Sequence, residues 1–332
     1  MTERYNPMAA DFELNKAISL YNSQEYKKAC ELLLPLANNN VPEAQWLLCQ
    51  ILLFGQDEVE KDQAKAIDYL VKAADADFPP AKLNLAWVLL EGVFMPKNIE
   101  IGIGMLKDTA NQGFPNAQND LGLLYSEGKF IGKDIQKAIY YLNLSAENGN
   151  AESYVALGHI YSEGIDIEKD YKLSFEFNQK AAQKGSASGM FNLALSYKKG
   201  EGVEKDMQLA LEYYKKSANY GNSKAAVNLG AMYANGDIGP VDFTESYKWY
   251  EVGAKLGDAI AQSNLGIMQS SGQGVEKNNI LALMWYYLSS FNGNTDVEDE
   301  IVRLQNSMSS VEVSDAREKS QKFSKSFPSV LF

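Results

Sequence analysis

The sequence predicts an all-α fold, a right-handed α-α superhelix (solenoid) built from tandem helix-turn-helix repeats of about 36 residues. Three observations lead to this prediction. Small residues recur every 36 positions between Ala81 and Ala261, and each is followed four positions later by a leucine. An Asp or Asn recurs at the same interval ahead of a second apolar stretch, and glycine follows the end of each stretch.

The first stretch of each repeat has the apolar spacing of a helix and stops at a glycine, which suits a left-handed residue just past a helix end. The small residues are Ala81, Ala117, Ser153, Gly189, Ala225 and Ala261; the leucines are Leu85, Leu121, Leu157, Leu193, Leu229 and Leu265; the glycines are Gly92, Gly128, Gly164, Gly200, Gly236 and Gly272. An earlier repeat begins at Ala44, which makes seven.

The second stretch follows a residue with a short polar side chain. These residues are Asp62, Asn98, Asp134, Asp170, Asp206, Asp242 and Asn278. Asp and Asn accept hydrogen bonds from the unpaired amides at the start of a helix, so each should cap a second helix. Two helices of this size cannot bury a core alone. We therefore expect the repeats to stack and to share one core.

The domain organisation follows from this register. The repeats are expected at residues 44–80, 81–116, 117–152, 153–188, 189–224, 225–260 and 261–296. Residues 1–43 are predicted to form a capping hairpin, with two helices over residues 11–40 joined around Ser23–Glu25. Residues 297–332 are predicted to form capping helices. All of these parts are expected to form one continuous and complete solenoid.

Charge and composition exclude several classes of function. The net charge is −12 over 332 residues. A protein that binds nucleic acid or an anionic membrane would need clustered Lys and Arg. A basic partner would be attracted, although acidity also serves solubility. The N-terminus does not resemble a secretory signal, no apolar run could span a bilayer, and two cysteines cannot form a disulfide framework. A cytoplasmic location is therefore expected.

Residues 189–221 carry a family pattern most clearly: Gly-Glu-Gly-Val-Glu-Lys-Asp at 200–206, then Ala210, Tyr213, Tyr214 and Ala218. This pattern resembles the Sel-one-like (Sel1-like) repeat family, relatives of the tetratricopeptide repeats, over residues 44–296. The first 40 residues look more like an ordinary tetratricopeptide unit. The resemblance implies a right-handed superhelix and an adaptor that assembles or regulates protein complexes. It also implies that the first helix of each repeat lines the concave face.

Helical geometry then suggests which side chains face a partner: the third, fourth, seventh, tenth and eleventh of each repeat. The fourth site reads Asn84, Asp120, Ala156, Asn192, Asn228 and Asn264. An asparagine side chain both donates and accepts, so a row of them suits the backbone of an extended peptide. Alternatively, these side chains bond to neighbouring helices and tie the repeats together.

The first two repeats carry large apolar residues at these sites: Trp46, Leu53, Phe54, Leu83, Trp87 and Leu90. Burying one aromatic ring removes about 150–250 Å² from water and contributes roughly 4–6 kcal/mol gross, whereas a net hydrogen bond contributes about 1 kcal/mol. These residues are therefore the expected source of affinity, unless the N-terminal hairpin covers them, Trp46 above all. Further along, His159, Lys198 and Lys199, near Glu127 and Glu163, suit either a mixed-charge partner or a solvated rim.

No residue pattern indicates chemistry. His159 has no base or metal signature around it, and Cys30 and Cys49 occupy sites where small buried residues belong. The Gly-x-Gly sequences recur as turns between helices and lack the spacing of a phosphate loop. We therefore expect no catalytic residue, no metal and no cofactor. The expected function is a non-enzymatic adaptor that binds a protein or peptide in the concave groove, with an immunity or antitoxin-like inhibitor of a cognate toxin as the alternative. A monomer is favoured.

Overall fold

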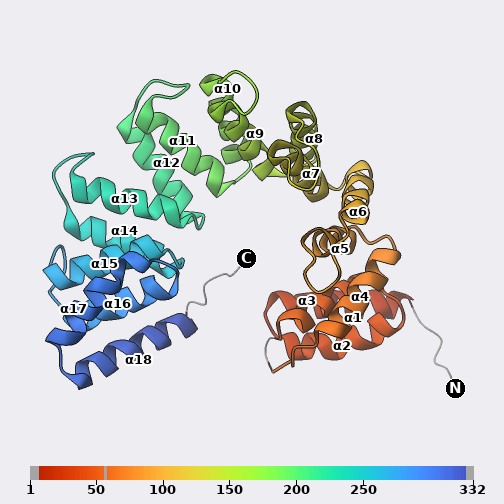
Figure 1. Cartoon of the computed structure of the whole chain (residues 1–332), viewed down its shortest axis with the longest axis horizontal. Helices are drawn as coiled ribbons and strands as arrows, with labels where there is room; N and C mark the ends of the chain where they lie inside the picture. Colours follow the sequence, from red (N-terminus) through yellow and green to blue (C-terminus); the bar gives the residue numbers. More distant parts are fainter. Residues whose placement is uncertain (1–6, 56–57, 327–332) are drawn as a thin grey trace. The chain divides into compact units, whose positions relative to one another are not determined.

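The computed structural model describes residues 7–55 and 58–326, and this part of the chain contains eighteen α-helices, one short 3-10 helix and no strand (Figure 1). The first helices of the repeats are α3 (Pro42–Phe54), α5 (Pro79–Glu91), α7 (Pro115–Glu127), α9 (Ala151–Glu163), α11 (Ala187–Lys199), α13 (Ser223–Asn235) and α15 (Ala259–Ser271). The second helices are α4 (Gln63–Asp75), α6 (Ile99–Asn111), α8 (Ile135–Glu147), α10 (Tyr171–Gln183), α12 (Met207–Asn219), α14 (Phe243–Lys255) and α16 (Asn279–Phe291). The all-α repeat architecture is confirmed.

Helices outside the repeats occur at both ends of the described residues. They are α1 (Pro7–Asn22) and α2 (Tyr26–Asn38) before the repeats, and η1 (Thr295–Val297), α17 (Glu298–Ser307) and α18 (Ser310–Ser326) after them. Helix α18 packs on α16, where the ring of Phe323 meets that of Trp285 edge to face at 5.0 Å between centroids. No helix in the described part of the chain is both long and apolar enough to cross a membrane.

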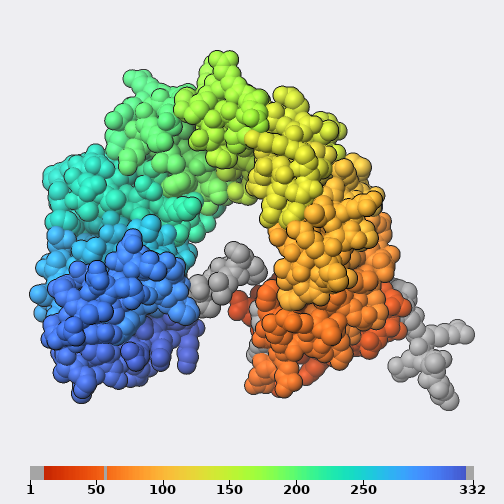
Figure 2. Space-filling model, in the orientation of Figure 1, coloured from red at the N-terminus to blue at the C-terminus, as the bar shows by residue number. Residues whose placement is uncertain are grey.

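The chain divides into two compact units, residues 1–150 with α1–α8 and residues 151–332 with α9–α18. Within each unit, consecutive helices of the repeats pack against one another, so the repeats of that unit form a continuous body (Figure 2). In the second unit, α9 also contacts α11 and α13 contacts α15, so the first helices of each of these pairs lie side by side.

Local capping chemistry sets the helix ends. All seven expected Asp and Asn side chains accept a backbone N–H at the start of their second helix; Asp134 Oδ1, for example, accepts from Lys137 N at 3.0 Å. Each first helix begins two residues before the start of its predicted repeat. Helices α3, α5 and α7 each begin with a proline, in the first turn, where its missing N–H breaks no hydrogen bond of the helix.

The core uses one contact in several repeats. The residue after the recurring leucine is small, and where it is Gly122, Gly158, Gly230 or Gly266 it lies against the side chain twenty positions later, in the second helix of the same repeat. In the last repeat, a Cβ atom on Gly266 would lie only 2.5 Å from Cε1 of Tyr286, so only glycine leaves room for this ring. The side chains that occupy this place are Leu70, Leu106, Leu142, Asn178, Tyr214, Tyr250 and Tyr286, each at most 6% exposed. We call this set the core column.

Candidate partner-binding surface

The seventh and eleventh positions of the first helices are accessible in every repeat. None of these fourteen residues is buried. The seventh positions hold Gln50, Trp87, Leu123, His159, Leu195, Ala231 and Ile267; the eleventh hold Phe54, Glu91, Glu127, Glu163, Lys199, Asn235 and Ser271. We call these side chains the first-helix surface. Because their chemistry differs from repeat to repeat while the core stays constant, most of them are suited to recognition; Gln50 and Trp87 also bond to the next first helix.

The prediction that Leu53 and Leu90 face a partner is wrong. Leu90 is fully buried, because α6 carries a glycine at the contact: a Cβ on Gly102 would lie 2.8 Å from Leu90 Cγ. Leu53 is 9% exposed and belongs to the core shared by α1–α5. In the third repeat the same place holds Ser126, whose hydroxyl donates to Leu123 O within its own helix at 2.8 Å.

Two tryptophans of the first unit connect successive first helices. Trp46 is partly buried and meets Phe78 edge to face at 5.9 Å between centroids. With the Asn84 amide oriented so that donors meet acceptors, its Oδ1 accepts from Trp46 Nε1 at 3.2 Å and from Gln50 Nε2 at 2.6 Å. Asn84 therefore ties α5 to α3, which agrees with the alternative that this side chain bonds to a neighbouring helix.

The second tryptophan repeats this arrangement one repeat later. Trp87 Nε1 donates to Asp120 Oδ2 at 2.6 Å, which links α5 to α7. Burial raises the pKa of the Asp120 carboxyl, and hydrogen bonds from Trp87 and Asn119 offset part of that shift. Leu83 packs beside Trp87 on the core of this region, and Phe54 remains 59% exposed. The apolar residues of the first two repeats therefore hold the repeats together and expose only part of their surface.

The asparagines of the second unit divide into two kinds. Asn192 Nδ2 donates to Asn178 Oδ1 on α10 at 3.0 Å, so this residue ties two helices together. Asn228 and Asn264 donate instead to the carbonyl oxygens of Lys224 and Ile260, four residues earlier in their own helices, both at 2.9 Å. Their Oδ1 atoms accept no hydrogen bond from the described residues. They remain as oriented acceptors one repeat apart.

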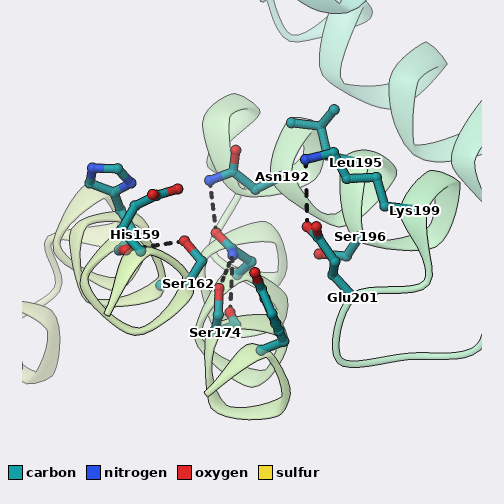
Figure 3. A pocket seen from close by; sticks show the side chains of 12 residues that line it. His159, Ser162, Ser174, Asn192, Leu195, Ser196, Lys199 and Glu201 are labelled. Carbon is teal, nitrogen blue, oxygen red and sulfur yellow. Dashed lines mark hydrogen bonds and ion pairs between the residues drawn. The ribbon is translucent and has the colours of Figure 1, made fainter. Parts of the chain in front are cut away.

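A pocket of about 310 Å³ opens between α9 and α11 above α10 (Figure 3). Its lining residues are Gly158, His159, Ser162, Glu163, Tyr171, Ser174, Asn178, Asn192, Leu195, Ser196, Lys199 and Glu201. The floor is polar: Asn178 is 3% exposed, and its Nδ2 donates to Ser174 O at 3.0 Å and lies 3.4 Å from Ser174 Oγ. The pocket belongs wholly to the second unit.

The structure brings three residues of the predicted mixed-charge group, His159, Glu163 and Lys199, into this pocket. His159 and Lys199 line it from opposite sides, α9 and α11, and Lys199 Nζ lies 3.6 Å from Glu201 Oε2 (Figure 3). Lys198, the residue before Lys199, is partly buried and does not line the pocket. Sequence reasoning missed Asn178, Ser174 and Glu201. One signal was available, because Asn178 interrupts a column of Leu and Tyr at 36-residue steps.

Within the described residues, no three His, Cys, Asp or Glu side chains are placed to hold a metal ion. Burial raises the pKa of the Cys30 thiol to about 11, with a smaller contribution from Glu31, and that of Cys49 to about 12. A thiol is a nucleophile only as the thiolate, so both are unreactive near neutral pH.

Several solved structures resemble this chain. The chain is similar to a protective antigen of uropathogenic Escherichia coli that has an SLR fold, at 28% identity and a TM-score of 0.60, over 88% of this chain and 64% of that one. It therefore spans less than two thirds of that antigen. It is also similar to a Sel1 repeat protein from Oxalobacter formigenes, at 24% identity and a TM-score of 0.63, over 90% and 88% of the two chains. At this identity, that likeness concerns the fold alone.

A weaker similarity links the chain to an immunity protein from Pseudomonas aeruginosa, at 19% identity and a TM-score of 0.48, over 64% of this chain and 80% of that one. A likeness of this degree says nothing about function. No curated protein matches the sequence significantly.

The family model of the Sel1 repeat matches residues 42–78, 79–114, 115–150, 151–186, 187–222, 223–258 and 259–294. These ranges begin where the first helices begin and end before the next repeat. Because together they span well over half of the chain, the protein belongs to the Sel1 repeat family.

Proposed function

We propose that this protein is a non-enzymatic scaffold that binds a protein or peptide partner through the first-helix surface. One observation carries the proposal: seven first helices present accessible side chains of varied chemistry at the same two positions, beside sites that are buried and uniform. Sel1 repeat proteins generally act as protein-interaction scaffolds. A fold that repeats its core and varies one surface is built for contact with another chain.

The oriented acceptors of the second unit suit an extended segment of the partner. Asn228 and Asn264 each use their amide N–H₂ within their own helix and keep Oδ1 available. Adjacent helices pack about 8–10 Å apart, which is roughly the length of three residues of extended chain. Backbone N–H groups of one peptide would therefore meet both acceptors. Two net hydrogen bonds of about 1 kcal/mol each fall well short of the roughly 8 kcal/mol of micromolar binding, so other contacts must supply most of the affinity.

Exposed apolar side chains on the same surface can supply it. Phe54 is 59% exposed in the first unit, and Ile267 is 47% exposed in the second. Covering such side chains contributes about 25 cal/mol for each Å² of apolar surface removed from water. The net charge of −12 adds attraction for a basic partner, and this part of the binding should weaken as salt is added.

Site-specific crosslinking tests the proposal. A photoreactive amino acid is placed at Lys199 or Ser271 on the first-helix surface, or at Tyr140 or Glu212, which are exposed on second helices. In lysate of the source organism, the first pair should capture one partner, and the control pair should not. Equal capture from both pairs, or capture from the second helices alone, would contradict the proposal.

The identity of the captured protein decides between the two forms of this function. A partner whose own activity stops when the complex forms, and whose gene lies beside this one, would make the chain an inhibitor. A partner that stays active in the complex would make it an adaptor.

A further inference from the structure

The core column is interrupted once. Six repeats place Leu or Tyr beneath the small residue of the first helix, and each of these side chains is at most 6% exposed. The fourth repeat places Asn178 there instead, 3% exposed, with its amide beneath Gly158. An asparagine side chain is smaller than that of leucine or tyrosine and cannot fill the same volume. The pocket between α9 and α11 lies directly over this exchange.

Asn178 also redirects its neighbour. Asn228 and Asn264 follow Tyr214 and Tyr250 by fourteen residues, the same spacing that separates Asn192 from Asn178, and both of their amides donate to their own helices. Asn192 holds the equivalent place over Asn178, and its Nδ2 turns to Asn178 Oδ1. The exchange of one core residue has thus created a polar floor from two amides and one hydroxyl, that of Ser174.

The polar floor still has hydrogen-bond acceptors that no described residue uses fully. Asn178 Oδ1 has a second lone pair, because Asn192 Nδ2 is its only donor among the described residues. Asn192 Oδ1 accepts no hydrogen bond from those residues. A ligand group that donates several N–H bonds would find partners here, whereas an aliphatic group would leave them unpaired at a cost of about 1–3 kcal/mol each.

The charged lining also favours a cation. Glu163 and Glu201 contribute two carboxylates, and Lys199 contributes one ammonium group, 3.6 Å from Glu201. Glu163 has no ion-pair partner among the described residues. His159 and Tyr171 also line the pocket. The two carboxylates and one ammonium group give the lining one net negative charge, in a chain whose net charge is −12.

We propose that this pocket binds the guanidinium group of an arginine side chain that projects from the partner. The inference rests on the proposed function and names the chemistry of one contact. A guanidinium group offers five N–H donors in a planar fork, which suits a carboxylate at the rim and amide oxygens at the floor. A volume of about 310 Å³ equals that of roughly ten water molecules at about 30 Å³ each, which accommodates the group and its methylene stem.

Small probes test the pocket without the partner. Binding of acetyl-arginine methylamide to the full chain is measured by ligand-observed NMR, beside acetyl-norleucine methylamide and acetyl-glutamate methylamide. The arginine probe should bind most tightly. Asn178→Leu, which installs the residue found at Leu142, should weaken its binding about tenfold or more while the protein stays folded. Equal binding of the norleucine or glutamate probe would overturn the proposal.

A matched pair of surface variants keeps the test decisive even if Asn178→Leu perturbs the fold. Glu163 lines the pocket, and Glu127 holds the same position one repeat earlier, outside it. Glu163→Gln should weaken binding of the arginine probe several-fold, and Glu127→Gln should leave it unchanged. Equal effects of the two variants would show general attraction to an acidic surface and overturn the proposal. A chain that captures a partner from Ser271 but shows no such difference keeps the proposed function and loses this pocket.

Discussion

Replacing Gly266 by alanine tests the packing on which every repeat depends. The added Cβ would lie 2.5, 2.7 and 2.9 Å from Cε1, Cδ1 and Cζ of Tyr286, a ring that is 2% exposed and has nowhere to move. Overpacking of this kind costs about 1–3 kcal/mol, whereas alanine gains about 1 kcal/mol over glycine in a helix. The expected result is a net loss of up to about 2 kcal/mol in the free energy of unfolding.

Gly104 provides the control, because it is exposed in α6 and an added Cβ would meet no atom within 4 Å. Gly104→Ala should therefore stabilise the protein by about 0.5–1 kcal/mol. Urea unfolding followed by circular dichroism measures both variants. Hydrogen exchange in α15 and α16 then locates the effect, because repeat arrays unfold in segments. Equal stabilisation by the two substitutions would refute the packing described here.

Three further predictions concern capping and titration. Asp206→Ala removes the acceptor of Gln208 N and Leu209 N and should cost about 1 kcal/mol in urea unfolding, with Glu204→Ala as a neutral control. Because burial raises the pKa of Cys49 to about 12, the thiol stays protonated in the folded protein while the unfolded thiol ionises. Its stabilising contribution should fall as pH rises from about 9 towards 12, and iodoacetamide should label it at pH 8 only after unfolding. Burial also raises the pKa of Asp120, so Asp120→Asn should stabilise the protein at pH 7 and lose that advantage below about pH 4, as thermal unfolding at the two pH values would show.

Helices and their ends were predictable because they depend on local chemistry. Asp134 caps α8 through a backbone amide three residues away, and Gly128 ends α7 with a positive φ of 75°. Both effects act within one turn of helix, so the sequence around them is sufficient. The 36-residue register then carries each assignment from one repeat to the next.

Side-chain exposure was less predictable because it depends on the neighbouring helix. Leu90 was expected on the surface, but Gly102 in α6 makes room for it in the core. Trp87 was expected as a free anchor, yet its indole N–H is held by Asp120, which lies 33 residues further along the chain. The pocket over Asn178 required knowing which second-helix residue lies beneath each first helix, and only the packed structure gives that correspondence.

The core column suggests how new binding preferences arise in such a chain. Each repeat folds around the same contact, so a change in one repeat is borne by that repeat and its immediate neighbours. Tyr250 and Asn264 hold the register of Asn178 and Asn192 two repeats further along, so an asparagine at position 250 would bring the same pair of amides to that place. Diversification of these scaffolds therefore needs no remodelling of the backbone: a single exchange beneath the surface changes what the surface selects.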